Sequence, residues 1–221
     1  MLYIAGWDKL EMLWQNEHGS ADSFCKLKEV QVSKCSNLVK MFPSSMRTRL
    51  GNLRELDVRS CEKLQEVFEI QIISININDG DEEVKCHKLD RVNASVDREL
   101  DVRSCPCLKS IFPGASVAKD LSGLQKLNIN DCGIEEIVGK EEGLETVGYE
   151  FEFPLLEVMM VLRLPNLASF CGGPHSSRFP LLTDLEVNDC PKMEGLLASE
   201  LLSSQGTPGS LFFTNNVRFS I

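Results

Sequence analysis

The chain is poor in positively charged residues. Its 221 residues include 23 Lys and Arg against 33 Asp and Glu, which gives a formal net charge of −10 at pH 7. Proteins that hold nucleic acid or an anionic membrane surface contact phosphate groups through clustered Lys and Arg. We therefore expect neither nucleic acid nor a membrane as a partner.

Long apolar runs and a targeting segment are also missing. No stretch approaches the ~18 consecutive apolar residues of a transmembrane helix. The N-terminal sequence MLYIAGWDKLEMLWQNE has no basic lead, and acidic residues interrupt its apolar positions, so it does not have the form of a signal peptide. The sequence predicts a cytoplasmic, intracellular protein whose nine Cys remain thiols.

Motifs for catalysis and for metal binding are absent as well. The sequence contains no G-x-x-x-x-G-K-[ST] nucleotide loop and no G-x-S-x-G nucleophile turn. Cys105 and Cys107 flank a proline, but no second Cys or His pair follows at zinc spacing. We predict that the chain is not an enzyme and that it uses neither a cofactor nor a metal.

What the sequence does contain is a repeat. The octapeptide RELDVRSC occurs at residues 54–61 and again at residues 98–105. Either a catalytic motif is used twice or a structural unit is repeated. Segments beginning at positions 27, 124, 156 and 182 align with both copies in the pattern L-x-x-L-x-L-x-x-C-x-x-L-x-x-φ, where φ is apolar. The third apolar position recurs at intervals of 26, 44, 27, 32 and 26, and is occupied by Val32, Val58, Val102, Ile129, Val161 and Val187.

The spacing has a physical meaning. A unit of about 26 residues lies in the range of leucine-rich repeats. Apolar residues two apart point to one face of a short strand, and each unit buries its layer against its neighbours. A small residue then turns inward at the bend and satisfies backbone groups. That position holds Cys35, Cys61, Cys105, Cys132 and Cys190, with Leu164 as the exception.

The predicted fold class is α/β, a leucine-rich repeat solenoid. We expect a curved right-handed array with a parallel β-sheet on its concave face, and with irregular loops and short helices on its convex face. The repeat domain covers residues 1–196, with a degenerate first unit at 1–23, a long insertion or worn repeat at 70–97 and an acidic loop at 135–152. Residues 197–221 form a C-terminal tail or cap. The acidic loop is either simply solvated or contacts a basic partner surface.

Three phrases carry a family resemblance. They are FCKLKEVQVSKCSNLVKMFPSSM (residues 24–46), NLRELDVRSCEKLQEVFE (52–69) and FPLLTDLEVNDCPKMEGL (179–196). Over roughly residues 24–196 the chain resembles the irregular leucine-rich repeats of plant intracellular immune receptors of the coiled-coil, nucleotide-binding type. The resemblance implies a recognition and autoregulatory module in defence against pathogens. Its partner would be a protein: a pathogen effector, a guarded host protein or the receptor's own nucleotide-binding domain.

An alternative is the substrate-recruiting repeat domain of a ubiquitin-ligase adaptor. That class has similar Cys-rich repeats of about 26 residues. Its repeats follow an F-box, however, and the 23 residues before Phe24 are too few for one.

The residues that alternate with the apolar ones face outward on the concave side. Five units present polar residues there, whereas one unit presents Val158, Met160 and Leu162. This apolar triplet predicts a protein-binding centre, unless the register is wrong or a loop covers it. The predicted partner-binding residues are Val158, Met160, Leu162, Asp184, Glu186, Lys126, Asn128, Asp101, Arg103, Asp57 and Arg59.

Overall fold

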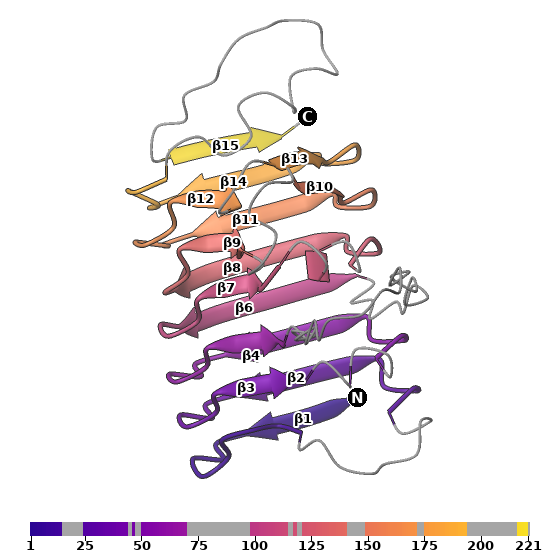
Figure 1. Cartoon of the computed structure of the whole chain (residues 1–221), viewed down its shortest axis with the longest axis vertical. Coiled ribbons are helices and arrows are strands. Elements are labelled where there is room, and N and C mark those ends of the chain that lie inside the picture. The colour runs from indigo at the N-terminus through magenta and orange to yellow at the C-terminus, as the bar shows by residue number, and fades with distance from the viewer. Residues whose placement is uncertain are drawn as a thin grey trace, which may run out of the picture.

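A computed structural model of the chain shows strands stacked along one long axis (Figure 1). It describes residues 1–14, 24–43, 46, 50–69, 98–114, 117–118, 121–140, 149–171, 175–193 and 216–220. The predicted insertion at 70–97, the centre of the predicted acidic loop and most of the predicted tail lie outside these residues.

The main sheet has eight strands, and neighbours in the sheet follow the order of the chain. All its pairings are parallel except the last, in which β15 runs antiparallel to β14 (Figure 1). The strands are β1 (Leu2–Ala5), β2 (Glu29–Ser33), β4 (Glu55–Arg59), β6 (Glu99–Cys105), β8 (Lys126–Cys132), β11 (Val158–Leu162), β14 (Asp184–Asn188) and β15 (Asn216–Ser220).

The register of this sheet confirms the repeat alignment. The third apolar positions of the six units are direct partners across five successive pairings, from Val32 on β2 to Val187 on β14. On β4, Leu56 and Val58 are both fully buried. The same two positions are buried on each strand of the main sheet from β2 to β14. Since burial of one such side chain contributes about 2 kcal/mol, each unit depends on its neighbours for a closed layer.

Each strand ends in the same bend. The residue after the strand's last outward position has a positive φ of 51° to 55° in six units, although none of these residues is glycine. Its backbone N–H donates to the carbonyl at the end of the following strand, as from Lys34 to Arg59 and from Ser60 to Arg103, both at 2.9 Å. The hydrogen bonds offset the roughly 1 kcal/mol that a left-handed conformation costs a residue with a Cβ.

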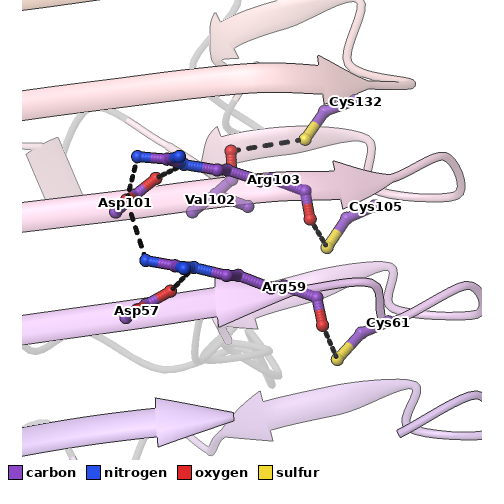
Figure 2. Close-up of polar contacts among 8 residues, drawn as sticks. All are labelled: Asp57, Arg59, Cys61, Asp101, Val102, Arg103, Cys105 and Cys132. Carbon is purple, nitrogen blue, oxygen red and sulfur yellow. Dashed lines mark hydrogen bonds and ion pairs between the residues drawn. The ribbon is translucent and has the colours of Figure 1, made fainter. Parts of the chain in front are cut away.

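The cysteines complete this bend. The Cys61 thiol donates to the Arg59 carbonyl at 3.5 Å, and the Cys105 thiol donates to the Arg103 carbonyl at 3.4 Å (Figure 2). The Cys132 thiol also reaches back to the Val102 carbonyl of the preceding unit, at 3.7 Å. Hydrogen bonds with Cys132 and Cys61, together with burial, raise the pKa of the Cys105 thiol, which therefore keeps its proton and remains a donor.

Across the core from the main sheet, the chain returns through short strands. These are β3 (Lys40–Phe42), β5 (Glu66–Phe68), β7 (Ser110–Phe112), β9 (Glu136–Val138), β10 (Tyr149–Glu152), β12 (Ser169–Cys171) and β13 (His175–Arg178). They pair in parallel as β3-β5, β12-β9-β7 and β10-β13.

The prediction of short helices on this side is wrong for nearly all of the described part of the chain. There, only residues 117–118 are α-helical, and Met46 alone is in a 3₁₀ turn. A local reason is visible at Phe42 and Phe112, each of which precedes a proline that disfavours the helical region. No helix in the described ranges is long and apolar enough to cross a membrane.

Aromatic side chains connect these short strands. The Phe42 and Phe68 rings stack with centroids 5.8 Å apart, and Phe153 stacks on Phe179 at 5.5 Å. Phe112 lies against Phe153 at 5.9 Å. The aromatic contacts fix the spacing of units behind the main sheet, so the outward positions of that sheet are held by a packed core.

A substitution at Gly133 tests how closely the backbones of two neighbouring units pack, at Gly133 and Pro106. A Cβ on this residue would lie 1.8 Å from the Pro106 carbonyl oxygen. We expect Gly133→Ala to lower the free energy of unfolding by about 3 kcal/mol, because the backbone of one unit must move. Gly6 is the matched control, since it has a φ of +69° but open space at its Cβ. There the same change should cost only about 1 kcal/mol. Urea titration measures both variants, and equal losses would contradict the packing argument.

The thiols predict a loss of stability at alkaline pH. Burial raises the pKa of the Cys190 thiol above its value in the unfolded chain. The stability it contributes is therefore complete below about pH 8 and falls as the pH rises through the unfolded value of about 8.5. Between pH 8 and pH 10, Cys190→Ala should lose less stability than the unmodified chain in urea titrations. Parallel pH profiles for the two proteins would show that this thiol is not linked to folding.

Candidate functional site

The open face of the main sheet is formed by the residues that alternate with the buried ones. They lie in three rows that run perpendicular to the strands. In each row, successive residues are direct partners on neighbouring strands. From β2 to β14 the rows are Glu29, Glu55, Glu99, Lys126, Val158 and Asp184; Gln31, Asp57, Asp101, Asn128, Met160 and Glu186; and Ser33, Arg59, Arg103, Asn130, Leu162 and Asn188. The strand register continues the last two rows to Tyr3 and Ala5 on β1, and all three rows to Ser220, Arg218 and Asn216 on β15.

Between β2 and β14 of the main sheet, one strand interrupts the polar character of the open face, and at the β1 edge Tyr3 is also exposed. On β11, Met159 and Val161 are fully buried, whereas Val158, Met160 and Leu162 are partly exposed. We call these three outward residues the apolar window. The hypothesis of a register error is wrong, because the buried Leu164 occupies the Cys position of this unit and Leu155 is 42% exposed.

Polar strands flank the apolar window on both sides. On β14, Asp184 is the direct partner of Val158, and Glu186 is the partner of Met160. On β8, Lys126 and Asn128 take the corresponding places. The Oδ1 atoms of Asn128 and Asn130 are buried and have no hydrogen-bond partner within the part of the chain that the structure describes.

An ion-pair ladder lies on β4 and β6, beyond β8 from the window. It is formed by Asp57, Arg59, Asp101 and Arg103 (Figure 2). The Arg103 guanidinium binds Asp101 with two bonds, Nε to Oδ1 at 2.7 Å and Nη2 to Oδ2 at 2.6 Å. Arg59 Nε donates to Asp57 at 2.7 Å, and its Nη2 lies 3.6 Å from Asp101 Oδ2. The hydrogen bond to Asp101 raises the pKa of Arg103.

The two copies of the octapeptide form the ladder because their strands pair directly. Identical strands in register place each Asp beside an Asp and each Arg beside an Arg. The alternating charges then attract along and across the strands, and Asp101 is only 5% exposed. The four charges are thus largely committed to one another, while the apolar window and its flanks are not.

The structure places every predicted partner-binding residue on the open face. They form two adjoining groups, the apolar window with its flanks on β8, β11 and β14 and the ladder on β4 and β6, which meet where Asp101 is the strand partner of Asn128. The predicted set omitted the adjacent carboxylates of Glu29, Glu55 and Glu99, which are direct partners across three strands. The repeat alignment places them on the open face as well, because they share one position in the unit. Among the described residues, no group of three or more His, Cys, Asp or Glu side chains could hold a metal ion.

The two copies of the octapeptide allow a matched test of the ladder. Asp101 accepts two bonds from Arg103 at 7% side-chain exposure, whereas Asp57 accepts one from Arg59 at 22% exposure. We expect Asp101→Ala to lower the free energy of unfolding by about 2 kcal/mol, and Asp57→Ala by less than about 1 kcal/mol. Denaturant titration at low and high salt measures both. An equal loss in the two variants would mean that the ladder does not depend on burial of Asp101.

Comparison with known sequences agrees with this architecture. Residues 2–96 match the family described as plant disease resistance protein RPS2-like, leucine-rich repeats. No curated protein and no solved structure matches the chain. The parallel strands from β6 to β14 continue the same register beyond the matched residues. Residues 2–96 therefore resemble a leucine-rich repeat region of the plant disease resistance type.

Proposed function

We propose that the chain is a recognition module of plant immunity that binds a protein partner across the open face, with the apolar window at the centre of the contact. The family match supports the module, because such repeats generally recognise proteins and do not catalyse reactions. The observation that carries the choice of site is the partial exposure of Val158, Met160 and Leu162 between two polar strands of the open face.

The energetics favour this assignment. Partly exposed aliphatic side chains gain about 25 cal/mol for each Å² of apolar surface that a partner removes from water. Polar neighbours on both sides provide the rim that surrounds a typical interaction centre. The window is therefore a small apolar centre within a polar surround.

The backbone beneath the window supports binding by being ordered in advance. β11 pairs along its whole length with β8 on one side and with β14 on the other. Its inward residues Met159 and Val161 are fully buried. A site on such a strand loses little conformational freedom when a partner binds, so more of the contact energy appears as affinity.

The finer proposal is that this contact also regulates the receptor that carries the repeats. The partner would be a pathogen effector, a guarded host protein or the receptor's own nucleotide-binding domain, within the cytoplasm. An intramolecular contact of this kind would hold the receptor inactive until another ligand competes for the face. The family match supports a role in immunity and leaves these three partners as competing outcomes of the test below.

Adjacent methionines provide the test. Met160→Glu places a charge on the open face, so it should abolish partner binding while changing the melting temperature by less than about 2 °C, in keeping with a surface substitution. Met159→Glu buries the same charge in the core and should cost more than about 4 kcal/mol of stability.

Binding is read by photo-crosslinking in plant leaf cells. A photoreactive residue at Leu162 should give a discrete protein adduct that Met160→Glu removes. The same residue at Leu181, which is exposed outside the open face, should give none. An adduct that persists in the Met160→Glu variant would refute the window as the contact, as would a stability loss equal to that of Met159→Glu.

A further inference from the structure

We infer that the open face selects a partner segment that combines apolar anchors with positively charged side chains. This inference rests on the proposed function and adds the chemistry of the partner. The apolar window would receive the anchors, and the carboxylates of Asp184 and Glu186 would receive Lys or Arg.

The charge balance of the open face is the first argument. By strand register its acidic residues outnumber its basic ones by seven to four; the acidic ones are Glu29, Glu55, Asp57, Glu99, Asp101, Asp184 and Glu186, and the basic ones are Arg59, Arg103, Lys126 and Arg218. The ion-pair ladder commits both Arg side chains to Asp57 and Asp101. Of the remaining charged residues, five carry carboxylates and two, Lys126 and Arg218, are basic.

The uncommitted carboxylates form no ion pairs within the described part of the chain, although Arg218 is the strand partner of Glu186. Within the described residues, Glu29, Glu55, Glu99, Asp184 and Glu186 form no ion pair. The Asp184 side chain accepts only a neutral hydrogen bond from the Thr183 hydroxyl, at 3.1 Å. A positively charged partner therefore meets carboxylates that do not have to give up an internal ion pair, so little attraction is lost on binding.

The second argument is the position of these charges relative to the apolar window. Glu186 is the direct strand partner of Met160, and Asp184 that of Val158. Neighbouring strands lie about 4.8 Å apart. An extended segment that crosses the strands advances about 3.4 Å per residue. A cation one or two residues from an apolar anchor would therefore reach β14 while the anchor lies on β11.

The β8 side of the window is suited to neutral donors. The Oδ1 atoms of Asn128 and Asn130 lack hydrogen-bond partners among the described residues, and Asn128 is the strand partner of Met160. Rotation of either carboxamide would offer an acceptor to a backbone N–H of the bound segment. Lys126, in contrast, repels a cation on this side, so the arrangement favours one direction for the segment across the sheet.

A phage-displayed library of random dodecapeptides, selected on the full 221-residue chain, tests this inference. Peptides are first depleted on the Met160→Glu variant, so that enrichment depends on the apolar window. We expect the enriched sequences to contain an apolar residue with Lys or Arg one or two positions away. Enrichment of acidic or uncharged peptides, or no enrichment relative to the Met160→Glu variant, would overturn the inference.

Affinity measurements with one enriched synthetic peptide separate the two proposals. For Asp184→Asn combined with Glu186→Gln, we expect the Kd to rise about fivefold at 50 mM salt and less at 500 mM, as for exposed charge pairs. The exposed Glu62 lies outside the open face, and Glu62→Gln should leave the Kd unchanged.

If Met160→Glu abolishes peptide binding while the double variant behaves like Glu62→Gln, the charge inference fails and the proposed contact site stands. If Met160→Glu leaves binding of the purified peptide unchanged, both proposals fail at this site.

Discussion

The bend at the end of each strand is the interaction on which the array depends. A single carbonyl, such as that of Arg59 or Arg103, accepts the thiol of its own unit and the backbone N–H of the preceding unit. The first bond closes the turn and the second fixes the distance between units. Because the bend recurs with almost the same φ, small errors in stacking do not accumulate along the chain. The strict register of the main sheet follows from this repetition.

A fixed register arranges the outward side chains of the sheet in rows. Since every strand from β2 to β14 in the main sheet presents its first, third and fifth side chains at the same positions, residues far apart in sequence become neighbours on the open face. Like residues then lie beside like ones unless the sequence breaks the row, as it does at the apolar window. The repeated apolar positions therefore specify the core, whereas the outward positions that depart from the repeat give the open face its distinctive surface.

Much of the main sheet could be predicted from the sequence because one pattern controls it. The alternation around Val58 and Val161 specifies which side chains turn inward, and the thiol at Cys61 or Cys190 identifies the bend. The return path could not be predicted in the same way, because Phe42 and Phe68 are compatible with helix or strand until their stacking is known. The same limit applies to the candidate site: alignment placed Asp101 and Arg103 on the open face, but only side-chain geometry shows that they bind each other.

The two identical copies of the octapeptide leave an ambiguity in strand pairing when the chain folds. β4 and β6 present the same five side chains from Glu to Arg, so β2 cannot distinguish between them by contact alone. A chain that joined β2 directly to β6 would close the sheet with one layer fewer and leave 44 residues out of the array. Behind the sheet, the shorter array would also lose the stacking of Phe68 on Phe42. The full array therefore gains one buried layer and one aromatic contact over the shorter array, although the sheet strands alone leave the choice between them open.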